Sequence, residues 1–124
     1  NERMRYRMIL GIGLDLVEME RIEKSLVRSR KFAERILTER ELSLFDNLST
    51  QRQIEFLAGR FAAKEAYSKA VGTGIGKGCE LHQIEILKDD LGKPILSINW
   101  ELVNGFISIT HTKQVAAAQV VLMK

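Results

Sequence analysis

The chain has 124 residues, a formal net charge of +3, 45% hydrophobic residues and 28% charged residues, a composition typical of one globular domain with a single core. No apolar run is long enough to cross a bilayer, and so small a net charge gives no argument for nucleic-acid binding. A lone cysteine, Cys79, with no Cys/His cluster, excludes a disulfide framework and a zinc site. With no visible secretory signal, we expect a cytoplasmic protein outside the membrane.

Residues 1–7 are polar and basic without any period, and Met8 is a more natural start. We therefore interpret residues 1–7 as a leader or an artificial remnant and residues 8–124 as the single domain.

From residue 8 to residue 17 the side chains alternate, which predicts a β-strand. One face of this strand is fully apolar, and the other carries Gly11, Gly13 and then Asp15. Glycine inside a strand often marks the close approach of another backbone or of a ligand. Asp15 is either a site residue beside that bare face or only the start of the next helix.

The next segment, about residues 18–28, carries helix signals and a basic row, Arg21, Lys24 and Arg28, at positions i, i+3 and i+7. Such a row is usually a solvated face. An acidic partner, a phosphate-rich ligand or an RNA are the functional alternatives.

Residues 32–37 read as a short helix or turn, and the Thr38–Glu41 pattern predicts a capping box that begins another helix. After a polar linker, residues 54–71 predict a long helix that is apolar on nearly every side and therefore buried. Glu65 lies among apolar neighbours on this helix, where an unpaired carboxylate is costly. It needs a metal ion or Lys69 one turn on, unless the two form an ordinary pair on a solvated face.

Residues 72–78 contain four glycines in seven positions, so their backbone could approach phosphate oxygens. This loop does not match nucleotide-binding fingerprints, because it follows a helix rather than a strand. The remaining chain predicts four strands at about residues 84–88, 95–99, 106–110 and 115–122, the first two forming a hairpin. His111, in the turn before the last strand, is either inert or helps hold a phosphate.

The sequence therefore predicts an α+β fold with an antiparallel β-sheet packed against a long central buried helix and shorter helices. Two carboxylates from distant segments, nearby lysines and a glycine-rich loop are typical of a site that holds Mg²⁺ together with substrate phosphates. This chemistry fits a nucleotide pyrophosphatase as well as a transferase.

Three segments are more specific. Residues 11–18 (GIGLDLVE), 60–66 (RFAAKEA) and 108–112 (SITHT) closely resemble the holo-(acyl-carrier-protein) synthases, the small bacterial 4′-phosphopantetheinyl transferases. Residues 32–37 also resemble a segment of that family, and the resemblance extends from residue 8 to about residue 123.

This resemblance implies transfer of the 4′-phosphopantetheine arm of coenzyme A to a serine of apo acyl carrier protein, in fatty acid biosynthesis, with release of adenosine 3′,5′-bisphosphate. It implies that Asp15 and Glu65 bind Mg²⁺ (or Mn²⁺), and that Glu65 and Lys69 are catalytic. The residues implied to line the nucleotide and its phosphates are Arg60, Lys64, Lys69, Gly74, His111 and Thr112.

The resemblance also implies that Arg21 and Arg28 dock the acidic carrier protein, and that the chain forms a homotrimer with sites between subunits. An outward glycine face on the first strand would be compatible with such a trimer. The general base stays open among Glu65, a metal-bound water and a carboxylate of the carrier. Two rival functions are a Mg²⁺-dependent nucleotide pyrophosphatase and a basic RNA-binding module. The second is disfavoured because RNA bases stack on aromatic side chains, and only 6% of the residues are aromatic.

Overall fold

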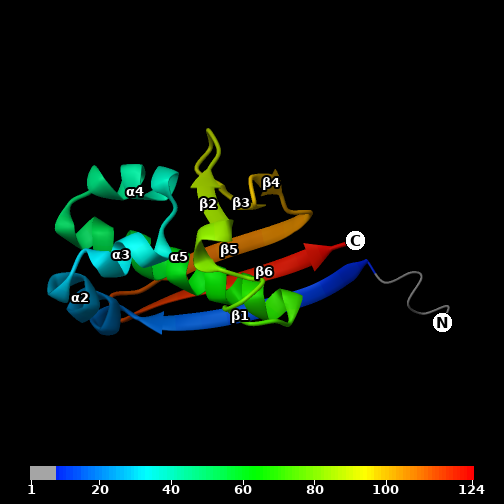
Figure 1. Cartoon of the computed structure of the whole chain (residues 1–124), viewed down its shortest axis with the longest axis horizontal. Helices are drawn as coiled ribbons and strands as arrows, with labels where there is room; N and C mark the ends of the chain where they lie inside the picture. Colours follow the sequence, from blue (N-terminus) through cyan, green and yellow to red (C-terminus); the bar gives the residue numbers. More distant parts are fainter. Residues whose placement is uncertain (1–7) are drawn as a thin grey trace.

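A computed structural model describes residues 8–124; the predicted leader, residues 1–7, lies outside the described residues. Within residues 8–124, four helices follow the first of five strands, and one two-residue strand and one 3₁₀ turn complete the fold (Figure 1). In chain order the elements are β1 (Ile9–Glu18), α2 (Met19–Arg28), α3 (Lys31–Ile36), α4 (Glu39–Asp46), α5 (Thr50–Val71), η1 (Leu81–Gln83), β2 (Ile84–Lys88), β3 (Pro94–Ile98), β4 (Glu101–Leu102), β5 (Gly105–His111) and β6 (Val115–Met123).

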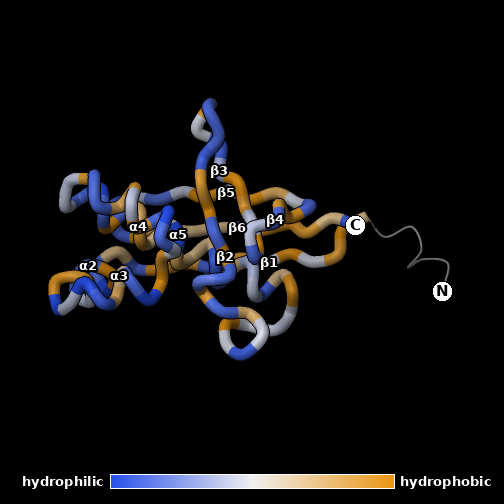
Figure 2. Tube along the Cα trace, turned by 45° about the horizontal axis from the view of Figure 1, so that its top comes forward, coloured by the Kyte–Doolittle hydropathy of each residue, from blue (hydrophilic) through white to orange (hydrophobic). Residues whose placement is uncertain are grey.

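The strands form two antiparallel sheets of three strands each. The first has the order β1-β6-β5 and joins the two ends of the domain, while the second has the order β2-β3-β4. The predicted fold class is confirmed, with the difference that the sheet is divided in two. Strands β1 and β6 are largely hydrophobic along their length (Figure 2). Within residues 8–124, no helix combines the length and apolar character needed to cross a bilayer.

Helix α5 lies across the first sheet because two glycines of β1 leave room for its backbone. A Cβ atom added to Gly13 would lie 1.7 Å from the carbonyl oxygen of Ala66, and one added to Gly11 would lie 2.0 Å from that of Ala70. The predicted close approach of a backbone is confirmed. The glycine face points inward, however, so the expected outward glycine face was wrong: alternation defines two faces of a strand but not which one meets the core.

The outward face of the first sheet is apolar along β1. Leu10, Ile12, Leu14 and Leu16 are each more than half exposed. Ile12 pairs with Val121 of β6, which pairs in turn with Phe106 of β5, so these three lie in one row across the sheet. An exposed apolar surface of this kind marks an interaction site on a soluble protein.

On its other side, α5 is fixed by a buried ion pair. The ammonium group of Lys64 donates to the Glu41 carboxylate at 2.6 Å, to the carbonyl oxygen of Ile36 at 2.6 Å and to that of Leu81 at 3.2 Å. Both charged side chains are completely buried. Glu41 also accepts from the backbone N–H of Ile86 in β2 at 2.8 Å, so this pair connects α5 to α3, α4, η1 and the second sheet.

The local helix signals are largely confirmed. Thr38 and Glu41 form the predicted capping box at the start of α4. Helix α5 begins at Thr50, four residues before the predicted start, because Ser49 has the extended backbone of an N-cap and the polar residues after it continue the helix. It ends at Gly72, whose φ of +99° suits glycine at a helix C-terminus.

We predict that Gly13→Ala destabilises the protein by about 3 kcal/mol, the upper end of the usual cost of overpacking, because the added methyl group overlaps backbone that cannot rotate away. The measurement is urea-induced unfolding at one fixed protein concentration. Gly59→Ala is the matched control: its Cβ atom would meet only the side chain of Ile109 at 3.2 Å, and it should change stability by about 1 kcal/mol or less. A Gly13→Ala protein as stable as the wild type would contradict this account.

Candidate active site

Strand β1 and helix α5 bring Asp15 and Lys69 together although they are 54 residues apart in the sequence. The Lys69 ammonium donates to Asp15 Oδ1 at 2.9 Å and to the carbonyl oxygen of Leu14 at 3.2 Å. The Asp15 side chain is 17% exposed and that of Lys69 is 52% exposed. The hydrogen bond and charge of Asp15 raise the pKa of Lys69, with a smaller contribution from Glu65.

Glu65 lies one helical turn before Lys69 and belongs to the same cluster. Partial burial raises the pKa of its carboxyl group, and the negative charge of Asp15 raises it further, while Lys69 and Arg21 oppose the shift. The sequence predicted apolar surroundings for Glu65. The structure makes it half-buried, and the fully buried charged side chain of this helix is its neighbour Lys64.

The two carboxylates suit a hard divalent cation. Mg²⁺ prefers oxygen ligands and is commonly held by one or two carboxylates together with substrate phosphates. Lys69, one helical turn after Glu65, bonds Asp15 directly, which brings both carboxylates near one ammonium group, and the negative charge of Asp15 raises the pKa of the Glu65 carboxyl group. Across the described residues, no group of three or more His, Cys, Asp or Glu side chains could hold a metal ion by itself.

A basic row borders this cluster. Helix α2 buries Ile22 and exposes the predicted row of Arg21, Lys24 and Arg28. The Arg21 guanidinium lies 5.8 Å from the ring centroid of Phe61 on α5. This contact places the start of the basic row beside the carboxylate pair, as the effect of Arg21 on Glu65 also indicates.

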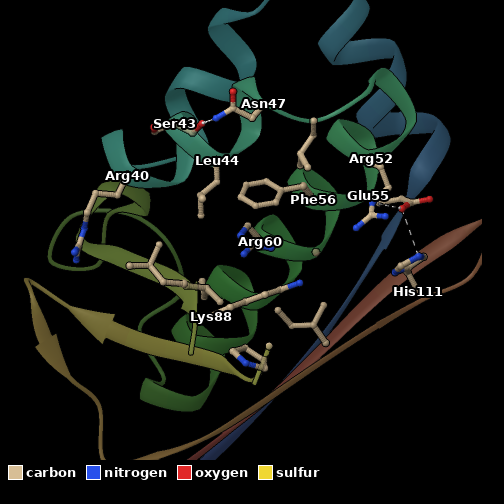
Figure 3. A pocket seen from close by; sticks show the side chains of 17 residues that line it. Arg40, Ser43, Leu44, Asn47, Arg52, Glu55, Phe56, Arg60, Lys88 and His111 are labelled. Carbon is tan, nitrogen blue, oxygen red and sulfur yellow. Dashed lines mark hydrogen bonds and ion pairs between the residues drawn. The ribbon is translucent and has the colours of Figure 1, made fainter. Parts of the chain in front are cut away.

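A cavity of about 940 Å³ lies between α4, α5, the second sheet and the end of β5. Figure 3 shows its labelled side chains, with the dashed line joining Glu55 to His111 at one end. His111 Nε2 lies 3.8 Å from Glu55 Oε1. The charged and titratable residues lining the cavity are Arg40, Arg52, Glu55, Arg60, Lys88 and His111, so cations outnumber the single acid.

Arg60 is the most enclosed of these cations. Its guanidinium carbon lies 3.6 Å from the ring centroid of Phe56, and burial lowers its pKa to about 10 against the opposing charge of Glu41. Within residues 8–124, its Nε is the one buried side-chain nitrogen or oxygen without a hydrogen-bond partner. Because a buried unpaired donor is costly, this cation is well placed to receive an anionic group in the cavity.

The cavity and the carboxylate cluster lie on different parts of α5. Phe56 and Glu65 are nine positions apart, which corresponds to about 14 Å along a helix, and they point to different sides of it. Asp15, Glu65 and Lys69 do not line the cavity. One chain therefore presents a carboxylate site and a cationic cavity that do not adjoin each other.

The other predicted site residues divide into two groups. Gly74, in the exposed glycine-rich loop, has a φ of +73°, and Thr112, exposed in the turn after β5, accepts from the backbone N–H groups of Gln114 and Val115. Lys64 differs: its ammonium is directed at three protein oxygens and is buried. Lys64 therefore stabilises the core and does not line the cavity.

Much of the cavity wall was not predicted from the sequence, although a signal was present. Arg52, Phe56 and Arg60 recur every four residues, which places them along one face of a helix. Lys88 and Arg40 could not have been assigned, because their place depends on how the second sheet packs against α4 and α5.

Comparison with known proteins identifies the family. A sequence model of the 4′-phosphopantetheinyl transferase superfamily matches residues 11–121. The chain belongs to this superfamily. It is 57% identical over 115 residues to the holo-[acyl-carrier-protein] synthase of Bacillus mycoides (strain KBAB4), an alignment that covers 93% of this chain and 96% of the relative.

Solved structures of the family agree with this assignment. The holo-(acyl-carrier-protein) synthase of Bacillus anthracis, in complex with CoA (3′,5′-ADP), is 53% identical and has a TM-score of 0.84, covering 95% of this chain and 99% of that chain. The Helicobacter pylori synthase, in complex with coenzyme A, is 34% identical with a TM-score of 0.77, covering 91% of this chain and 99% of that chain. The predicted family is confirmed, and these relatives give no support to a pyrophosphatase.

Proposed function

We propose that this protein transfers the 4′-phosphopantetheine group of coenzyme A to a serine of apo acyl carrier protein, giving holo acyl carrier protein and adenosine 3′,5′-bisphosphate. The observation that carries the proposal is the carboxylate pair Asp15 and Glu65, with Lys69 bonded to Asp15, in a chain that matches the superfamily over residues 11–121. We assign the reaction to one domain, residues 8–124, acting in fatty acid biosynthesis in the cytoplasm.

The serine hydroxyl attacks the phosphorus atom attached to pantetheine, in line with the departing bisphosphate oxygen. Asp15 and Glu65 would hold Mg²⁺, or Mn²⁺ in its place, and a divalent ion bound there neutralises the charge of the pyrophosphate. Lys69, whose side chain is half exposed, reaches the same phosphates and stabilises charge that develops on the leaving oxygen.

We assign the cationic cavity to the nucleotide of coenzyme A. Arg60 and His111 supply positive charge or hydrogen bonds inside it, and Gly74 and Thr112 would complete the phosphate contacts from exposed loops. Lys64 is left out of this set because its protons are already donated within the core.

We propose a homotrimer with active sites between subunits. The cavity and the carboxylates of one chain do not adjoin each other, so one bound coenzyme A would reach both only if they came from different chains. The apolar outer face of the first sheet, with Leu14 and Leu16 about 60% exposed in the single chain, is the surface that such an assembly would bury.

We propose that the row on α2 docks the carrier. Arg21 and Arg28 would attract the acidic surface of the carrier protein, and Arg21, beside Phe61 and within reach of the charge of Glu65, connects this surface to the reacting groups.

The test of the reaction is the mass of apo acyl carrier protein after incubation with this protein, coenzyme A and Mg²⁺, which should rise by one phosphopantetheine group. Glu65→Gln should lower turnover at least ~100-fold, the scale of losing a preorganised electrostatic group. Glu101→Gln, an exposed acid on β4, is the control and should react like the wild type. Release of the bisphosphate without carrier would favour a hydrolase instead.

For docking, the double variant Arg21→Ala/Arg28→Ala should raise KM for the carrier roughly three- to tenfold and flatten its dependence on salt, because electrostatic steering is lost. KM for coenzyme A should stay unchanged. The charge-retaining variant Arg21→Lys/Arg28→Lys should keep the salt dependence. If the alanine variant leaves KM for the carrier unaltered, the row is only a solvated face.

For assembly, Leu14→Glu should convert the trimer into monomers, because it introduces a charge into the apolar sheet face. Sedimentation velocity measures the change directly. Leu91→Glu makes the same chemical change at a residue that is 94% exposed at the β2–β3 tip, and it should leave the assembly intact. A wild-type protein that sediments as a single chain would disprove the trimer.

A further inference from the structure

Lys69 bonds two oxygen atoms of β1, and one of them belongs to the proposed metal ligand Asp15. Its ammonium contacts Asp15 Oδ1 at 2.9 Å and the carbonyl oxygen of Leu14 at 3.2 Å. Within residues 8–124, no cation bonds the side chain of Glu65, the second carboxylate, and only the more distant charges of Lys69 and Arg21 oppose the rise of its pKa. Asp15 is therefore the acid with an internal counter-ion.

Two cations cannot share Asp15 Oδ1 at little cost. An ammonium and a divalent ion that touched the same oxygen would lie only a few ångströms apart, where like charges repel strongly at the low effective dielectric of a partly enclosed site. Asp15 is only 17% exposed, so solvent screens this repulsion incompletely. A divalent ion on the other oxygen, Oδ2, would still lie only a few ångströms from the ammonium, so each cation weakens the binding of the other to Asp15.

The side chain of Lys69 can move, whereas its helix cannot. The α5 backbone at Ala66 and Ala70 lies directly on Gly13 and Gly11, which fixes the helix against β1. The Lys69 side chain is 52% exposed, and a lysine carries its charge on a flexible four-carbon stem. A rotation of this side chain would release Asp15 without changing the fold.

We propose that Lys69 and the divalent cation compete for Asp15 in the free protein, and that arrival of the metal releases the Lys69 ammonium toward the phosphates of the substrate. This inference rests on the proposed metal site and adds an order of events. Lys69 first neutralises the charge of Asp15, and it binds the substrate phosphates after the metal has taken its place. With Lys69 bonded to Asp15, one of the two carboxylates already has a counter-ion within the protein.

The test is Mn²⁺ binding to the free protein without coenzyme A. The amount bound is measured from the electron paramagnetic resonance signal of the Mn²⁺ that remains unbound. Lys69→Met should bind Mn²⁺ roughly two- to fivefold more tightly than the wild type, the range expected from losing a partly exposed ion pair. A structural role alone would not tighten binding. Asp15→Asn should lose most of the binding.

Two controls separate direct competition from a general change in charge. Arg21→Met removes a nearby cation that influences Glu65 but has no bond to Asp15, and it should tighten binding less than Lys69→Met. Lys24→Met removes an exposed cation that is paired with Glu20, and it should leave binding unchanged. Equal tightening by Lys69→Met and Arg21→Met would overturn the proposal.

The outcomes distinguish this inference from the proposed function. If Asp15→Asn binds Mn²⁺ as well as the wild type does, the metal site itself is wrong. If Asp15→Asn loses binding while Lys69→Met shows no tightening, the metal site stands and the competition is refuted. Crystals of the free protein grown with and without Mn²⁺ give a second readout: Lys69 should bond Asp15 only in the metal-free form, and an unbroken bond beside bound Mn²⁺ would also refute it.

Discussion

The contact between the glycines of β1 and the backbone of α5 is the constraint on which the rest of the structure depends. Gly11 and Gly13 let carbonyl groups of the helix lie where side chains would otherwise stand. Asp15 is the next residue on the same face, so the strand delivers its carboxylate to the turn of α5 that carries Glu65 and Lys69. The site is thus a direct result of backbone packing between two elements.

Much of this arrangement could be predicted from local patterns. Alternation identified β1, the Thr38–Glu41 box identified the start of α4, and the glycines of β1 indicated a close approach to a backbone. The pairing of Asp15 with Lys69 was not visible, because residues 54 positions apart meet only once strand and helix are packed. Spacing along the helix indicates Glu65 as the partner of Lys69 instead, because the two residues are one turn apart.

The prediction failed where a choice between two faces depends on tertiary packing. The apolar side of β1 was correctly recognised, yet it faces outward and the glycine side faces the core. Lys64 was assigned to the nucleotide on the basis of its motif, but its ammonium finds three oxygens inside the protein. A lysine in sequence gives no indication of whether its charge is solvated, bound to a ligand or paired in a core.

The buried ammonium of Lys64 also has a consequence for motion. Its three acceptors belong to the C-terminal end of α3, to α4 and to η1. Detachment of α4 would leave the Lys64 charge unpaired in an apolar interior, and detachment of α3 or η1 would leave one of its N–H donors without a partner. We therefore expect these segments to open largely as one cooperative unit. Slow hydrogen exchange should then extend from the middle of α5 into short helices that would otherwise fray independently.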